Sequence, residues 1–116
     1  PPMPLARLPD PPYYAVIFAS RRTDQDEAGY NEAATAMSAS AAQQDGYLGM
    51  DTTARDEDGM AMTVSYWREE QSIQNWKQQA DHTVVRKLGR EKWYRSYTLR
   101  VAKVERAYEF DVAGGE

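Results

Sequence analysis

The feature that most constrains the fold is a change of hydrophobic period at Glu69, inside a stretch that runs from residue 60 to residue 97. Residues 60–67 alternate with the period of two of a β-strand, which puts Tyr66 on one face and Trp67 on the other. After Glu69, apolar residues recur at helical spacing through residue 88, and Gly89 ends the pattern. The stretch therefore predicts a strand followed directly by a helix. It also holds all three tryptophans and the only histidine of the chain.

The residues before this stretch predict a strand, a helix and a second strand. Residues 13–20 form a continuous apolar run rich in β-formers, typical of a strand buried on both faces. Residues 25–44 contain seven alanines and no proline, which predicts a helix capped by Thr23 or Asp24. Its apolar stripe is built mostly from small side chains, so the helix can lie close to a sheet. Residues 47–54 predict the second strand, which a loop over residues 55–59 joins to the strand at 60–67.

A last strand over residues 97–110 completes the order βαββαβ, which is the α+β ferredoxin-like arrangement with an antiparallel sheet. The many charges of this last strand predict an edge position. In this arrangement the helices cover one face of the sheet and leave the other bare. Because residues 13–20 are apolar on both faces, we expect a second copy to cover the bare face. The expected assembly is a homodimer that forms a dimeric α+β barrel.

Composition sets the class of protein and excludes several kinds of partner. A length of 116 residues predicts one domain, over residues 13–110, between a proline-rich arm (1–12) and a tail (111–116). The net charge of -4 argues against nucleic acid, and no apolar run is long enough to span a membrane. The absence of cysteine excludes thiolate chemistry, and no zinc or phosphate-loop spacing occurs. We expect a cytoplasmic protein whose arm is dispensable for folding.

Several short segments resemble the antibiotic biosynthesis monooxygenase family of dimeric α+β barrels. The segments are residues 64–67 (Val-Ser-Tyr-Trp), 73–76 (Ile-Gln-Asn-Trp), His82, 88–94 (Leu-Gly-Arg-Glu-Lys-Trp-Tyr) and 101–106 (Val-Ala-Lys-Val-Glu-Arg). The similarity covers about residues 13–110 and is greatest to an uncharacterised bacterial branch of the family. It implies the predicted fold and one of three functions.

The first implied function is a small monooxygenase that oxidises an aromatic or quinol-type molecule without a tightly bound cofactor or metal. The second is haem binding or haem degradation, and the third is ligand binding without catalysis. Haem is the less favoured alternative, because the haem-degrading relatives use an Asn in the first strand and residues 13–20 contain none. Their His also follows the Trp by about one more helical turn than His82 follows Trp76.

Eight residues are the candidates for the site. The catalytic candidates are His82, Tyr66 and Arg22, and the substrate-binding candidates are Trp67, Trp76, Trp93, Tyr97 and Arg86. Each has a plain structural alternative: the aromatic residues could pack the core, and the arginines could be solvated. In a continuous helix His82 points away from the apolar face, so a functional role for it requires the helix to break between Gln78 and His82.

Overall fold

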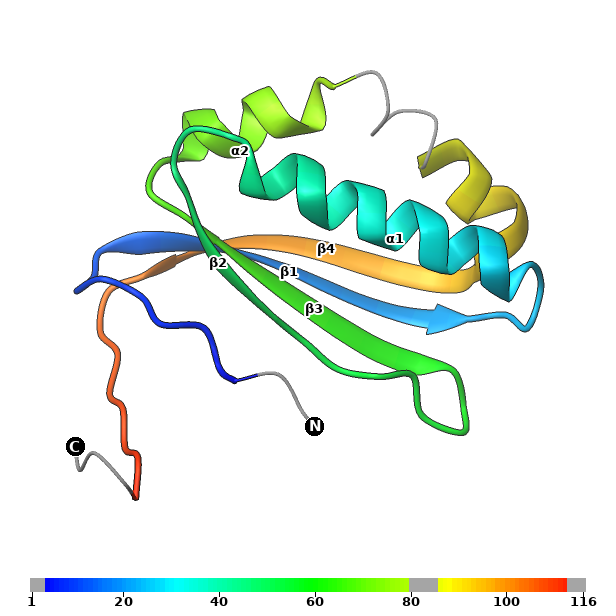
Figure 1. Cartoon of the computed structure of the whole chain (residues 1–116), viewed down its shortest axis with the longest axis horizontal. Helices are drawn as coiled ribbons and strands as arrows, with labels where there is room; N and C mark the ends of the chain where they lie inside the picture. Colours follow the sequence, from blue (N-terminus) through cyan, green and yellow to red (C-terminus); the bar gives the residue numbers. More distant parts are fainter. Residues whose placement is uncertain (1–3, 80–85, 113–116) are drawn as a thin grey trace.

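One antiparallel sheet, covered by helices on one face, forms the body of the molecule (Figure 1). The structure is a computed structural model that describes residues 4–79 and 86–112. Its elements are β1 (Tyr13–Arg22), α1 (Glu27–Ala42), β2 (Tyr47–Thr52), β3 (Met60–Trp67), α2 (Glu70–Lys77), the π-helix η1 (Gly89–Trp93) and β4 (Tyr94–Val104). The strand order β2-β3-β1-β4 confirms the predicted α+β ferredoxin-like fold. It also confirms that the last strand lies at an edge.

The first helix is shorter than the prediction of residues 25–44 because its cap lies further along the chain. Asp26, not Thr23 or Asp24, is the N-cap: its backbone is left-handed and its carboxylate accepts a hydrogen bond from the Gly29 amide (3.2 Å). Thr23 instead bonds to the segment before β4, through its amide to the Trp93 carbonyl and through its hydroxyl to the Lys92 carbonyl. These bonds tie the end of β1 to η1.

The predicted continuous helix over residues 69–88 is wrong. The helix α2 ends at Lys77, where the Gln79 amide turns back to the Trp76 carbonyl (3.1 Å) and tightens the last turn. The chain is helical again at residues 86–88 and then forms η1. The helix therefore ends before His82 in the sequence, and His82 itself lies outside the described residues.

The last strand begins and ends earlier than predicted, at Tyr94 and Val104. Its extent follows β1, its only neighbour in the sheet, because the ladder runs from the pair Tyr13–Val104 to the pair Arg22–Tyr94. Residues 105–110 pair with no strand within the described part of the chain and leave the sheet. The strand β1 in turn extends two residues beyond its apolar run to Arg22, and β2 ends at Thr52, before the predicted residue 54.

Each edge strand contains one irregular residue. In β4 the register to β1 shifts between Arg21 and Arg22, which leaves Arg95 as an extra residue. In β2 the register to β3 shifts in the same way and leaves Leu48 as an extra residue. Such β-bulges change which side chains share a face, because alternation restarts after the extra residue.

The hydrophobic core lies between the helices and one end of the sheet. It consists of Val16, Ala41, Trp67 and Ile73, and the rings of Tyr47 and Trp76 pack against it. Trp67 is fully buried, and its ring centroid lies 5.2 Å from that of Trp76 and 5.4 Å from that of Tyr47. The predicted faces of β3 are therefore correct: Trp67 points toward the helices.

The proline-rich arm contacts the face of the sheet that the helices leave bare. The Ala6 amide donates to the Asp51 carboxylate (2.7 Å), and Ala6 and Leu8 lie against Gly49, where the missing side chain leaves room. Figure 1 shows the arm and the segment after β4 leaving the same end of the sheet and running on the side away from the helices. These contacts show that the arm docks on the sheet; its dispensability for folding stays a prediction.

Candidate functional site

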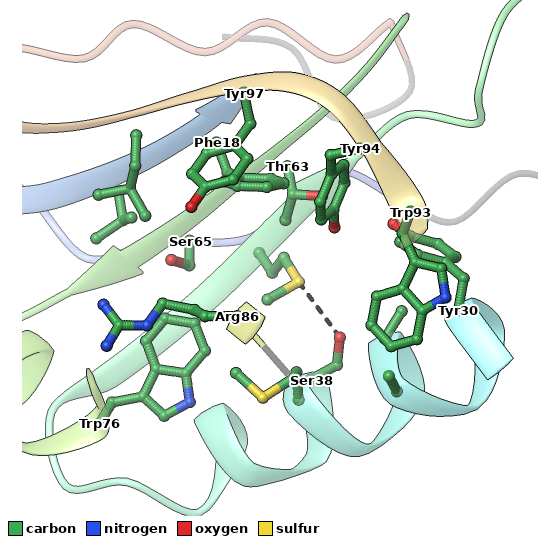
Figure 2. A pocket seen from close by; sticks show the side chains of 16 residues that line it. Phe18, Tyr30, Ser38, Thr63, Ser65, Trp76, Arg86, Trp93, Tyr94 and Tyr97 are labelled. Atoms are coloured by element: carbon green, nitrogen blue, oxygen red, sulfur yellow. Dashed lines mark hydrogen bonds between the residues drawn. The ribbon is translucent and has the colours of Figure 1, made fainter. Parts of the chain in front are cut away.

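A chamber of about 180 Å³ lies between α1 and the helix-covered face of the sheet. Its floor is the predicted stripe of small residues on α1, which includes Ala33, Ala34 and Met37. Because the side chains of Ala33 and Ala34 are short, a cavity remains between the helix and the sheet (Figure 2). Nearly all of the lining is apolar or aromatic, as is typical of sites for small organic ligands. For scale, an apolar cavity of about 150 Å³ accommodates benzene.

Three aromatic rings from neighbouring strands form one wall of the chamber. The ring centroids of Phe18, Tyr94 and Tyr97 lie 5.3–5.5 Å apart from one another. Tyr94 and Tyr97 are three residues apart, so regular alternation would send them to opposite faces of the sheet. The bulge at Arg95 places both on the chamber side of the sheet, where Phe18 also lies.

Trp93 forms the end of the chamber near the start of α1. It is buried, its ring lies edge-on to Tyr30 at 5.8 Å, and its indole N–H donates to the Asp26 carboxylate (3.3 Å). The same carboxylate caps α1. The helix start and η1 therefore fix the orientation of this tryptophan together.

Trp76 and Arg86 lie at the other end of the chamber (Figure 2). Trp76 is half-buried and belongs both to the edge of the core and to the chamber wall. Arg86 is exposed and brings the only charged side chain among the described lining residues. Of the predicted substrate-binding residues, the structure thus brings together Trp76, Arg86, Trp93 and Tyr97.

Ser65 and Tyr94 bring hydroxyl groups to the chamber lining. Ser65 is buried and accepts a bond from the Trp67 indole N–H (2.9 Å), which leaves its own O–H free to donate. Burial, reinforced by Tyr30, raises the pKa of Tyr94 above its ordinary value, so that this phenol stays protonated at neutral pH. Ser38, on the floor, contacts the sulfur of Met50 (3.8 Å).

The two candidates at the end of β3 do not line the chamber. Trp67 is fully buried in the core and packs behind Trp76. Tyr66 lies on the opposite face of the sheet, where its hydroxyl donates to Asp51 (2.8 Å) and its ring contacts Tyr13. Burial, followed by the bond to Asp51, raises the pKa of Tyr66 to about 12. The sequence analysis placed these two residues on opposite faces of the strand, as the structure does, but still assigned both to one site.

Arg22 lies beside the chamber in a second, polar pocket. Its side chain is buried, stacks on the Tyr30 ring with Cζ 3.4 Å from the centroid, and forms an ion pair with Glu27 (3.1 Å). Tyr30 and Phe18 line both pockets and form part of the boundary between them. Arg22 thus lies next to the aromatic wall without being part of it.

Several lining residues were not among the eight candidates, and Phe18, Tyr30 and Ser65 are three of them. The continuous apolar run of β1 gave no sign that Phe18 faces a cavity. Tyr30 belonged to the predicted helix stripe, and its size among alanines was a usable signal. Ser65 shares the predicted face of Trp67, and a serine on the inner face of a strand is the kind of buried polar group that marks a site. His82 lies outside the described residues, so its place stays a prediction.

Comparison with known proteins identifies the family. A family model described as antibiotic biosynthesis monooxygenase matches residues 12–88. The chain belongs to that family. It is 45% identical over 102 residues to the uncharacterized protein YqjZ of Bacillus subtilis, and the match covers 88% of each chain. It is 28% identical over 92 residues to a jasmonate monooxygenase of Pyricularia oryzae; the match covers 78% of this chain and 43% of that enzyme.

Solved structures share the fold at low sequence identity. SnoaB, a cofactor-independent oxygenase from Streptomyces nogalater, superposes with a TM-score of 0.68 at 11% identity, over 84% of this chain and 97% of SnoaB. Rv0793 from Mycobacterium tuberculosis gives a TM-score of 0.69 at 16% identity, over 83% and 99% of the two chains. Within residues 4–79 and 86–112, no helix is long and apolar enough to cross a membrane. The same residues contain no cluster of three or more carboxylate or imidazole side chains arranged to hold a metal.

Proposed function

We propose that the protein is a monooxygenase that oxidises an aromatic or quinol-type small molecule without a tightly bound cofactor. The observation that carries this proposal is the apolar chamber between α1 and the sheet, walled by Phe18, Tyr94, Tyr97, Trp76 and Trp93. Membership of the monooxygenase family and the likeness to SnoaB support it. A flat, apolar molecule fits such a lining, because aromatic rings attract one another in stacked and edge-on arrangements.

The chemistry requires a substrate that can give an electron to O₂ after it loses a proton. A ring CH₂ carbon flanked by aromatic rings meets this need, because the anion is delocalised. Transfer of one electron to O₂ and recombination of the two radicals form a C–O bond. Loss of the second proton from the same carbon then breaks the O–O bond, which leaves C=O in the product and releases the other oxygen as water. One O₂ and one substrate thus give one product and one water.

In this proposal the protein contributes hydrogen bonds and a dry environment. The free O–H of Ser65 would stabilise negative charge on the substrate oxygen during electron transfer. Tyr94 is a poor general base because its raised pKa keeps its proton in place. His82 remains the proposed base, and Arg86 the proposed partner of an anionic ring oxygen. Tyr66, across the sheet, is left without a catalytic role.

Oxygen uptake tests this function directly. With a panel of anthrone-type and quinol substrates, we expect one O₂ consumed per product and no peroxide release detected with catalase. Replacement of Ser65 by Ala should lower the rate about a hundredfold to a thousandfold, as for other single donors to a developing oxyanion. The matched control is Ser96→Ala, an exposed strand serine on the other face of the sheet, which should leave the rate unchanged. Tight binding of these compounds with no O₂ uptake would assign the protein to ligand binding without catalysis.

The bare face of the sheet supports a homodimer as the working assembly. Ile17 and Ala19 of β1 and Val64 of β3 lie on it, and Met60 and Met62 beside them are more than a third exposed. A second copy presents the same apolar surface, so the two sheets can bury each other. Sedimentation at micromolar concentration should give the mass of a dimer, and Val64→Lys should shift it toward a monomer. A wild-type monomer under these conditions would contradict the assembly.

A further inference from the structure

The second pocket lies at the start of α1 and differs from the chamber in its chemistry. It is lined by hydroxyl groups of Ser20, Thr52, Thr53 and Thr63 and by the guanidinium groups of Arg22 and Arg55. Phe18, Tyr30, Ala34 and Thr63 line both pockets, so the polar pocket adjoins the chamber directly. A ligand in the chamber can therefore extend one end among these polar groups.

Arg22 is the most deeply placed charge of the polar pocket. Its side chain is 8% exposed, and one of its terminal nitrogens bonds to Glu27. Its Nε is buried and has no hydrogen-bond partner among residues 4–79 and 86–112. A buried guanidinium donor without an acceptor is costly, and such groups are rare in folded proteins. The missing partner is an acceptor, because every N–H of arginine is a donor.

Glu27 bonds to only one terminal nitrogen of Arg22 and is partly exposed. Its side chain is 47% exposed, and its other oxygen lies 3.8 Å from Arg55. Arg55 is also held by the Thr23 carbonyl (2.8 Å) and by Asp24. Two arginines and one carboxylate, that of Glu27, line this pocket, while Asp24, which pairs with Arg55, lies outside the lining. The Nε edge of a guanidinium is one side of the fork that binds a carboxylate with two parallel bonds.

We propose that the polar pocket binds a carboxylate carried by the ligand of the chamber, with Arg22 as its main contact. The carboxylate takes the Nε edge of Arg22 and displaces Glu27, which turns to Arg55. The hydroxyl group of Ser20 lies in the same lining and can complete its hydrogen bonds. The substrate class is then an aromatic acid, with the ring system in the chamber and the acid group beyond Tyr30. This inference rests on the proposed function of the chamber.

Calorimetric titration of the full chain with a matched pair of probes tests the inference. The probes are 2-naphthylacetate and its neutral amide, which differ only in the charged group. Wild type should bind the acid about tenfold or more tightly than the amide, as expected for a charge-assisted pair. Arg22→Gln should abolish this preference and leave binding of the amide unchanged. Arg21→Gln, on the adjacent residue that faces the other side, is the control and should keep the preference.

Glu27→Gln provides a second test that leaves Arg22 in place, in case Arg22→Gln does not fold. Removal of the competing carboxylate should strengthen binding of the acid several-fold without an effect on the amide. A purely structural ion pair predicts instead a lower melting temperature and an unchanged acid-to-amide ratio, which would overturn the inference. Equal affinity of wild type for both probes would also overturn it, while the chamber and its proposed function would stand. If neither probe binds, both proposals fail.

A titration with inorganic phosphate separates a ligand-borne carboxylate from a free anion. Phosphate binding that Arg22→Gln removes, together with an acid-to-amide ratio near one, would assign the pocket to a free anion and overturn the carboxylate assignment. Phosphate that merely competes with the acid, while the ratio stays high, supports it.

Discussion

Trp76 has two roles that its position makes inseparable. Its indole packs on Trp67 behind it and walls the chamber in front of it. Sequence spacing placed Trp76 correctly on the apolar face of its helix, but spacing does not tell whether the space beyond a ring is filled or empty. The same limit applies to Trp67, which was expected to bind substrate and lies in the core.

The two tryptophans should therefore differ in their cost to stability. Trp67→Ala empties a filled position and should lower the free energy of unfolding by about 3–5 kcal/mol. Trp76→Ala should cost about 1–2 kcal/mol less, because part of its surroundings is already open. Urea denaturation with both variants checks this difference. Equal losses would show that the chamber side of Trp76 is packed in solution.

Tyr66 gives a pH dependence of stability. In the folded state the pKa of Tyr66 is raised from 10.0 to about 12. Between these two pH values Tyr66 stays protonated in the folded protein, whereas a tyrosine in the unfolded chain is ionised. The unfolded state therefore gains stability as the pH rises from about 10 to about 12, and the protein should unfold more easily across this range. Tyr66→Phe should make this decline shallower, although it loses the Asp51 bond at all pH values. Tyr108→Phe, at an exposed position, is the control, and an equal decline in both variants would contradict the assignment.

At the scale of elements, period and composition predicted the order and type of all six main segments. What they did not predict were the two bulges, the end of α2 at Lys77 and the π-helix at residues 89–93. These features depend on pairing with another strand or on contacts across the fold, which a local pattern does not contain. Tyr94, for example, belongs to a strand only because β1 extends as far as Arg22.

Gly89 shows how closely η1 and β4 approach each other. A β-carbon at this position would lie 2.8 Å from the Tyr94 ring, so the ring would have to move. We expect Gly89→Ala to lower stability by about 1–3 kcal/mol, as overpacking does, and to weaken binding of apolar probes in the chamber. In a Tyr94→Val background the same substitution should cost less, because the ring is gone. Lys92→Ala, at an exposed position in η1, is the control in thermal unfolding.

At the scale of the whole molecule, the arm docks on the bare face of the sheet at its β2 edge. Asp51 accepts hydrogen bonds from both Ala6 and Tyr66, so it joins the arm to β3 across β2. The proline content correctly indicated an extended segment but said nothing about whether the segment docks. Docking depends on one carboxylate, and its partner is a backbone amide that any residue could supply.

Deletion of residues 1–10 should lower stability by about 1–2 kcal/mol, the sum of one charge-assisted hydrogen bond and a small apolar contact. For a chain of this size that is a drop of several degrees in Tm. Asp51→Asn should produce part of the same drop, and Arg7→Ala, at an exposed position of the arm, should produce none. An unchanged Tm after deletion would show that the arm is detached in solution.

Haem degradation is not expected of this protein. The haem-degrading relatives use a strand-borne Asn, and β1 offers no amide side chain on the chamber face; Phe18 and Ser20 stand there. Hemin-loaded protein given a reductant and oxygen should keep its Soret band. Loss of the band with iron release, abolished by His82→Ala and not by catalase, would contradict this expectation.

The bulges in β2 and β4 also determine where the chain can change its length. Loss of Arg95 or Leu48 would remove a bulge and leave a regular strand, with the same rings still facing the helices. Loss of one residue from β3 would instead exchange the faces of everything beyond it and send Trp67 to the side of Tyr66. Single-residue insertions and deletions should therefore be tolerated in the edge strands β2 and β4. The same changes should prevent folding in the central strands β1 and β3.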